Sequence, residues 1–217
     1  CLLLGLFLSL RTGIFFTGRN LINILEANSF KLLLAIGMTF VIASGGIDLS
    51  VGSILSLSAI FTALCMKQNI PVWLAILVGL LSGILMGLIN GALIHFTGIN
   101  AFIITLGTSF LYRGLALIVT RGTPVSKLPA AYRAFGGGDI FQVESGVYMA
   151  LLVLLLSIPL LYKMRWGHYI TTLGGNPVAL RRCGVRTGAW RISTFAVMGF
   201  LAALAGIIIS ARLNSAE

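Results

Sequence analysis

The sequence predicts an all-α, polytopic membrane protein, and three observations support this fold class. Hydrophobic residues make up 58% of the 217 residues, and charged residues make up only 9%. The mean hydropathy of +1.05 lies far above that of soluble domains. The apolar residues also fall into runs of about 20, the length that a helix needs to cross a bilayer.

Polar residues, glycines and prolines divide the apolar sequence into predicted crossings. Six of these cover residues 31–47, 50–66, 71–94, 99–120, 146–162 and 192–210. A shorter apolar stretch, residues 1–10, is expected to be the remainder of a seventh helix. We therefore expect one transmembrane domain over residues 1–217, truncated at both ends.

The first two crossings form one apolar run in which Asp48 is the only ionisable residue. The run from Leu32 to Met66 holds 35 residues, which is too long for a single helical crossing. A break is predicted at Gly45-Gly46, where the backbone is least restricted. Asp48 would then open the second helix near the membrane edge. A carboxylate costs roughly 2.5 kcal/mol or more at the bilayer centre, so we expect Asp48 to face the bundle interior or an interface.

The third crossing contains an internal repeat of glycine at every fourth position. The repeat consists of Gly79, Gly83, Gly87 and Gly91, which share one face of a helix. Such a face allows a neighbouring backbone to approach closely, so tight helix packing is the favoured interpretation. The alternative is that the smooth face also lets helices slide past one another.

The loop between Tyr162 and Ile192 sets the predicted orientation. It contains six basic residues and no acid, so the positive-inside rule places it in the cytoplasm. Counting back through the crossings places residues 95–98 inside and residues 11–30, 67–70 and 121–145 outside. The last of these is expected to be a surface loop, because it contains three consecutive glycines and two prolines.

The same basic loop contains the signals of a short helix. Asn176 is a good N-cap and Pro177 suits the first helical position, while Gly184 suits the position after the helix end. The predicted helix, Pro177–Cys183, is too short to be stable alone in water. We expect it to dock into a groove on a partner. The alternative is an ordinary basic loop that binds anionic lipid.

Several other classes of protein are disfavoured. The net charge of +10 is spread over segment ends and one loop instead of forming a basic face, so nucleic acid is not an expected partner. No His or Cys residues have metal-ligand spacing, so neither a metal nor another cofactor is expected. Paired acids and a phosphate-binding G-x-x-x-x-G-K-[ST] loop are also missing, so the chain is not expected to be an enzyme.

Three segments resemble one known family. Residues 35–42 followed by 45–52 resemble the signature of the sugar-type permease subunits of bacterial ABC importers, the ribose permease family within the branched-chain-amino-acid/ribose permease superfamily. Residues 174–185 are similar to that family's inner loop, and residues 199–212 to the helix after it. The residues that match the signature motif are Gly45, Gly46, Asp48, Ser50 and Gly52.

This resemblance implies a permease fold of about ten helices when complete, of which about seven belong to this fragment. It implies location in the bacterial cytoplasmic (inner) membrane. The implied partners are a second permease subunit in a homo- or heterodimer, an ABC ATPase subunit, an extracytoplasmic sugar-binding protein and membrane lipid. Residues 163–191 would be the cytoplasmic coupling loop. Its implied contacts with the ATPase are Asn176, Pro177, Ala179, Leu180, Arg181, Arg182 and Gly184.

The function expected from the resemblance is uptake of ribose or a similar monosaccharide, with ATP hydrolysed on a separate subunit. The alternative is a secondary transporter or channel in which Asp48 is the proton or ion site. One intramembrane acid with no second acid, His or Lys nearby in sequence favours a capping and packing role for Asp48 instead.

Overall fold

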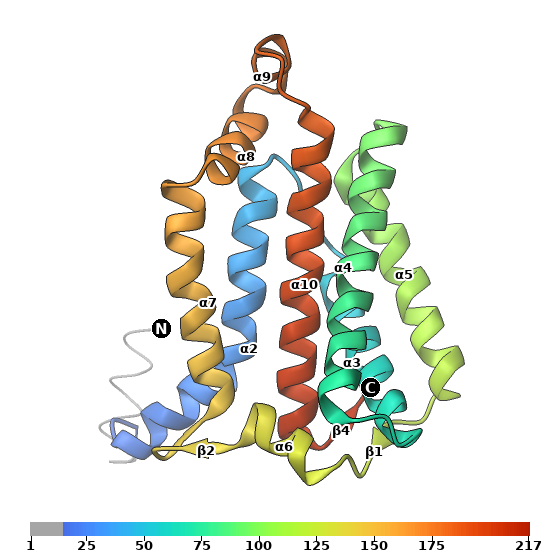
Figure 1. Cartoon of the computed structure of the whole chain (residues 1–217), viewed down its shortest axis with the longest axis vertical. Helices are drawn as coiled ribbons and strands as arrows, with labels where there is room; N and C mark the ends of the chain where they lie inside the picture. The colour runs from blue at the N-terminus through green and yellow to red at the C-terminus, as the bar shows by residue number, and fades with distance from the viewer. Residues whose placement is uncertain (1–14) are drawn as a thin grey trace.

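The computed structural model describes residues 15–217, and this part of the chain is almost entirely helical (Figure 1). The predicted helix remnant at residues 1–10 lies outside the described residues. The helices are α2 Gly18–Ala43, α3 Val51–Lys67, α4 Val72–Thr97, α5 Ala101–Thr120, α6 Ala130–Gly137, α7 Ser145–Tyr162, α8 Arg165–Gly175, α9 Pro177–Arg182 and α10 Thr187–Leu213. Two antiparallel pairs of very short strands join β1 Val125–Ser126 to β4 Ser215–Ala216 and β2 Asp139–Ile140 to β3 Val143–Glu144.

The predicted all-α, multi-pass fold is confirmed. Five helices of the described part, α2, α4, α5, α7 and α10, are long and apolar enough to cross a membrane. The remaining predicted crossing is α3, which has only 17 residues. The predicted break between the first two crossings is also confirmed, because α2 ends at Ala43 and Gly45 has a φ of 78°. Only glycine adopts such a backbone without strain.

The helices form a bundle with two distinct ends (Figure 1). One end, called the α9 end below, carries α8, α9 and the turn between α4 and α5. The opposite end, called the α6 end, carries α6 and the four short strands. The loops therefore group as the predicted topology requires, with residues 98–100 at the same end as residues 163–186.

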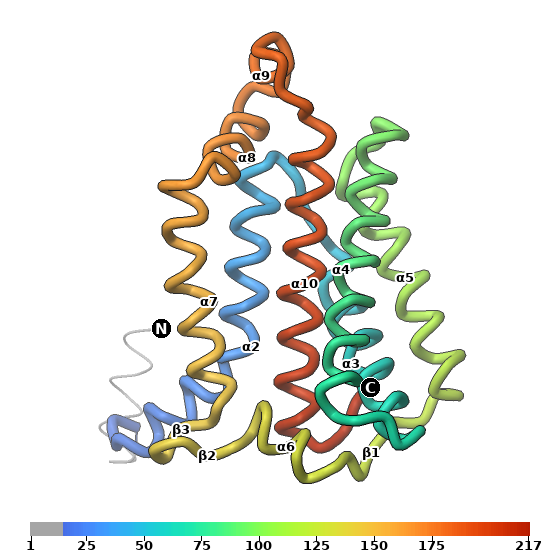
Figure 2. The backbone as a smooth tube through the Cα atoms, viewed as in Figure 1, coloured from blue at the N-terminus to red at the C-terminus, as the bar shows by residue number. Residues whose placement is uncertain are grey.

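Helix α10 lies at the centre of the bundle, with α2 and α7 on one side and α4 and α5 on the other (Figure 2). Within its most apolar stretch of 18 residues, 67% of the residues are buried, compared with 22–33% in the corresponding stretches of the other four long helices. The outer helices therefore expose most of their apolar surface, as expected where lipid is the solvent.

The glycine face of α4 packs closely against α10 and α3, as a packing role would require. A Cβ atom added to Gly83 would lie 2.4 Å from Ala203 Cβ and 2.5 Å from the Gly199 carbonyl oxygen. At Gly87 the added atom would lie 2.2 Å from the Phe195 carbonyl oxygen. Gly79 and Gly91 are equally tight, so all four repeated glycines are needed for this approach.

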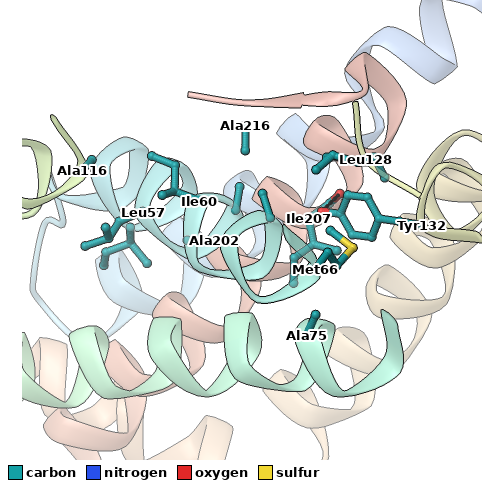
Figure 3. Close-up of a cluster of buried hydrophobic side chains, with 14 of the residues drawn as sticks. Leu57, Ile60, Met66, Ala75, Ala116, Leu128, Tyr132, Ala202, Ile207 and Ala216 are labelled. Carbon is teal, nitrogen blue, oxygen red and sulfur yellow. Dashed lines mark hydrogen bonds between the residues drawn. The ribbon is translucent and has the colours of Figure 1, made fainter. Parts of the chain in front are cut away.

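The segment 121–145, predicted as an ordered or mobile surface loop, does lie mostly at the surface, but it contains regular secondary structure. This segment folds as β1, α6 and the β2–β3 hairpin, and α6 packs onto α10. Tyr132 of α6 is completely buried, with its hydroxyl oxygen 2.6 Å from Ser210 Oγ and its ring near Met66 and Ile207 (Figure 3). A buried ring with a bonded hydroxyl stabilises this segment against the bundle, which glycine content alone did not indicate.

Two further segments predicted as loops are helical. Residues 18–30 extend α2 beyond the predicted crossing, and residues 165–175 form α8. Both carry polar residues at intervals that leave one face apolar. In α8, Ile170 and Leu173 are buried while Arg165 and His168 are exposed. An amphipathic helix of this kind lacks the continuous apolar run on which the predicted crossings were based.

Replacing Gly83 with leucine is expected to prevent normal packing of α4 against α10. The new side chain would meet a neighbouring backbone carbonyl, which cannot rotate away, so we expect a loss of about 3 kcal/mol or more in stability. Thermal unfolding of the full-length protein in detergent measures the effect. Gly107→Leu is the matched control, since a Cβ atom at Gly107 meets nothing within 4 Å. Equal stability of the two variants would contradict the packing role.

Candidate functional site

The non-helical segment Ser44–Ser50 joins α2 to α3 and enters the bundle from the α9 end (Figure 2). Asp48 in this segment is 1% exposed. Its Oδ1 atom accepts hydrogen bonds from the Ser50 backbone N–H at 2.8 Å and from Ser50 Oγ at 2.6 Å. Because these bonds fix the turn that begins α3, they agree with the predicted capping and packing role of Asp48.

A buried chain of hydrogen bonds leads from Asp48 to α4 and α5. Asn90 Nδ2 donates to Ser50 Oγ at 2.7 Å. The Tyr112 hydroxyl oxygen lies 3.2 Å from Asn90 Oδ1 and 3.1 Å from the Met86 carbonyl oxygen, so it can donate to either. Asn90 is completely buried and Tyr112 nearly so. The network therefore connects the segment 44–50 with two helices that are distant in sequence.

Thr105 of α5 binds the backbone of the same segment. Its hydroxyl accepts a hydrogen bond from the Leu49 N–H at 3.1 Å and lies 3.2 Å from the Ile47 carbonyl oxygen. Inside a membrane, non-helical backbone is tolerated only where protein groups satisfy it. Thr105 supplies such a group, and the sequence analysis did not identify it.

Asp48 lies well inside the bundle, away from its α9 end. Its network partner Asn90 is seven residues before the end of α4 at Thr97, which corresponds to about 10 Å along a helix. The physical reason is that the chain between Gly45 and Ser50 is not coiled into a helix, so it covers more length per residue than a helix does. The non-helical residues therefore carry the start of α3 well into the bundle.

The second carboxylate oxygen of Asp48 has no hydrogen-bond partner. Within residues 15–217, Oδ2 is the only buried side-chain nitrogen or oxygen atom in this condition. The described residues also contain no group of three or more His, Cys, Asp or Glu side chains that could hold a metal ion. Asp48 thus offers one free oxygen without a second acidic ligand.

A cavity of about 570 Å³ lies between α3 and α5 and reaches the turn that precedes β1. Leu49 and Gly52 line its inner part. Its polar lining consists mainly of hydroxyl groups, with one guanidinium and one carboxylate, from Ser53, Ser56, Ser109, Thr120, Thr123, Arg113 and Glu217. Ser53 Oγ and Ser109 Oγ are hydrogen-bonded to each other at 3.0 Å in the cavity wall. Arg113 makes no ion pair or hydrogen bond with other described residues, so its guanidinium is free to donate to a ligand.

Helix α9 forms the tip of the α9 end (Figure 1). The Asn176 side chain accepts from the Ala179 N–H at 2.9 Å, and Gly184 has a φ of 78°. Both predicted caps are therefore confirmed, although the helix ends at Arg182, one residue earlier than predicted. Ala179, Arg181 and Arg182 are exposed, whereas Leu180 is buried and so is not part of the free surface.

The two motifs identified in the sequence meet at this end of the bundle. A Cβ atom added to Gly174 would lie 2.2 Å from the Ala43 carbonyl oxygen and 2.9 Å from the Gly45 backbone nitrogen. The end of α8 thus rests directly on the backbone that joins α2 to the segment 44–50. Gly175, the next residue, has open space around it.

The family model described as the permease component of branched-chain amino acid transport systems matches residues 20–217. The chain belongs to this permease family. Its identity to the ribose import permease of Haemophilus influenzae is 36% over 94% of the chain and 64% of that relative. The corresponding values for the D-allose transport system permease of Escherichia coli are 35%, 100% and 67%. For the autoinducer 2 import permease of Yersinia pestis they are 34%, 92% and 57%.

These similarities confirm the family resemblance proposed from the sequence. The chain spans about 64% of the length of the ribose import permeases that it matches. The names of the relatives describe permeases, which agrees with the expectation that the chain itself is not an enzyme. No solved structure matches the chain.

In this permease the sequence analysis identified Asp48 and Ser50 but missed Asn90, Thr105 and Tyr112. The missed residues belong to α4 and α5, and their only local signal is a polar group within an apolar helix. Such residues usually face the bundle interior, so this signal could have placed them inside without naming their partners.

Replacing Asn90 with alanine is expected to destabilise the permease by about 1–3 kcal/mol. The change removes the donor to Ser50 and leaves buried polar atoms with fewer partners. Thermal unfolding of the full-length permease in detergent measures the effect, and Asn28→Ala on the exposed face of α2 is the control. An unfolding temperature that falls equally in both variants would rule out a special role for the buried network.

Proposed function

We propose that this chain belongs to the transmembrane permease subunit of an ABC importer that takes up ribose or a similar monosaccharide across the bacterial cytoplasmic membrane. The observation that carries the proposal is the hydroxyl-lined cavity between α3 and α5, in a member of this permease family. The relatives named for ribose, D-allose and autoinducer 2 support a small polar substrate.

The chemistry of the cavity suits a polyhydroxylated molecule. Serine and threonine hydroxyls both donate and accept hydrogen bonds, so they can replace the water around each sugar hydroxyl. Arg113 only donates, so it favours substrate oxygens, and the Glu217 carboxylate in the same lining can accept from substrate hydroxyls. The cavity volume of about 570 Å³ lies within the usual range for small-molecule sites.

The α9 end supplies the proposed connection to ATP hydrolysis. The exposed surface of α9, with Ala179, Arg181 and Arg182, is proposed to dock on the separate ATPase subunit. When ATP closes the ATPase pair, α9 and α8 would move together. Gly174 would then press on Ala43–Gly45 and shift the segment that leads to Leu49 at the cavity.

The remaining partners of the complete importer also belong to this proposal. A second permease subunit, identical or different, would face the exposed side of the α3–α5 cavity. An extracytoplasmic sugar-binding protein would deliver substrate at the α6 end, where the cavity reaches the surface. By the positive-inside rule the α9 end is cytoplasmic, because the six basic residues between Tyr162 and Ile192 have no acidic neighbour in that loop.

One observation favours a second candidate function, a secondary transporter that uses Asp48. Its buried Oδ2 atom has no partner and could bind a proton or an ion. Against this, Oδ1 is held by two hydrogen bonds from Ser50, and no other acid lies in the buried network. These contacts need an oxygen acceptor at residue 48 but not a negative charge.

Uptake by the reconstituted system distinguishes the two functions. We expect the full-length permease, with its ATPase and binding protein in liposomes, to accumulate labelled ribose only when ATP is supplied and regardless of a proton uncoupler. Asp48→Asn should keep at least half of this uptake, because asparagine Oδ1 can accept both hydrogen bonds from Ser50. Uncoupler-sensitive uptake that needs no ATP and is abolished by Asp48→Asn would establish the secondary transporter instead.

Two adjacent glycines test the proposed transmission from α9 to the cavity. Gly174→Ala should push the Ala43 carbonyl away and lower ATP-driven uptake at least tenfold, with the complex still assembled and hydrolysing ATP. Gly175→Ala, which adds the same methyl group in open space, should stay within about twofold of wild type. Parallel measurements of uptake and ATP hydrolysis in both variants test whether movement is transmitted through Gly174. Similar uptake by both variants would refute transmission through this contact.

A further inference from the structure

A second cavity lies at the α9 end, outside the proposed pathway. It is open and has a volume of about 810 Å³, between the end of α4 and the start of α10. Its charged and titratable lining groups are Arg181, Arg186, Arg191 and His95. These four side chains come from three separate segments, so the fold itself assembles the basic cluster.

No acidic side chain balances this cluster. The chain has five acidic residues, and four of them lie toward the α6 end, where Arg212 Nε binds Glu144 Oε2 at 2.8 Å. The fifth is Asp48, which is buried beside Ser50. In the part of the chain that the structure describes, the guanidinium groups of the three arginines make no ion pair or hydrogen bond. Arg191 is half-buried and also lines a smaller cavity of about 160 Å³ next to Gly45.

A partly buried guanidinium without an acceptor is costly, so Arg191 favours an anion, and the exposed Arg181 and Arg186 add positive charge beside it. The first turn of α10 adds to this preference. Its N-terminal residues Thr187 and Gly188 line the same cavity, and no side chain caps the helix. The partial positive charge of the helix N-terminus therefore attracts an anion, as the arginines do. Gly188 also lets the His95 ring lie against this turn, since an added Cβ would be 2.3 Å from Nε2.

The surroundings of the cavity identify the source of the anion. Phe96 and Ile99, next to the lining residues His95 and Gly98, are 80% and 44% exposed. Together with Leu93 they continue the exposed apolar surface of α4 toward the centre of the membrane. A ligand with a phosphate head and acyl chains satisfies both surfaces at once. A free phosphate ion would leave the apolar side unused.

We propose that this cavity binds the headgroup of an anionic phospholipid from the leaflet at the α9 end, with the acyl chains along α4. Arg186 and Arg191 hold the phosphate, and Phe96 contacts the chains. The cavity shares Arg181 with the proposed docking surface, but lipid binding by the permease alone requires neither ATPase nor sugar and can be tested separately.

Native mass spectrometry of the full-length permease in detergent tests this site. Phosphatidylglycerol and phosphatidylcholine are added separately, and the bound fraction of each is measured. One basic residue near a lipid surface contributes about 1 kcal/mol, which is about fivefold in affinity. Arg186→Gln with Arg191→Gln should therefore weaken phosphatidylglycerol binding by about 25-fold. The matched control, Lys163→Gln with Arg165→Gln, removes two charges from the same end outside the cavity and should change binding less than twofold.

Other results would overturn the proposal. These are equal phosphatidylglycerol binding by wild type and the Arg186/Arg191 variant, or an equal loss in the control. Displacement of phosphatidylglycerol by millimolar inorganic phosphate would assign the cavity to a free anion. Loss of ATPase co-purification in that variant, with lipid binding unchanged, would assign it to the subunit interface.

A measurement on the wild-type protein keeps the test valid should the double variant fail to fold. Phosphatidylglycerol with a photoactivatable acyl chain should crosslink to peptides that contain residues 93–99 or 181–191. Crosslinks confined to other peptides would also overturn the proposal.

Discussion

The structure depends on one constraint, which is that non-helical backbone inside a membrane must be satisfied by the protein itself. The segment Ser44–Ser50 meets it with side chains from several elements. Thr105 binds the backbone of Leu49, and Asp48 binds that of Ser50. Asn90 then holds Ser50 from α4. Because these groups come from three parts of the chain, the position of the segment fixes how α3, α4 and α5 pack together.

Small residues make this arrangement possible. The glycine face of α4 brings α10 so close that backbone atoms limit the approach, and α10 thereby becomes the most buried long helix of the described part. Gly206 of α10 is similarly close to α3, since an added Cβ would lie 2.2 Å from the Leu55 carbonyl oxygen. A centre packed on backbone atoms is stiff, because there are few side-chain rotamers to adjust. Movement is therefore easier at the periphery and in the segment 44–50 than along α10.

Short sequence patterns predicted several features of this structure. The break at Gly45, the caps of α9 and the glycine face of α4 each depend on a few neighbouring residues, and all three were found. The sequence analysis missed helices α6 and α8 because their apolar faces are short and interrupted. The composition of these two segments therefore resembles that of a loop. The prediction missed part of the network around Asp48, because Asn90 and Tyr112 are 42 and 64 positions further along the sequence. Only the packing of α4 and α5 brings them together.

The cavities of about 570 Å³ and 160 Å³ both border the segment 44–50, which indicates where a pathway would be closed. Leu49 borders the cavity between α3 and α5, while Ser44 and Gly45 border the small cavity toward the α9 end. Seven residues of non-helical chain thus separate two spaces on opposite sides. If the chain transports sugar as proposed, this segment could act as a gate. Opening it would require only the exchange of a few side-chain hydrogen bonds, each contributing about 1 kcal/mol net. Displacing α10 would instead break many close backbone contacts at once. Gly174 presses on the segment from the side of α9, so the least costly movement is also the one that the proposed coupling helix can drive.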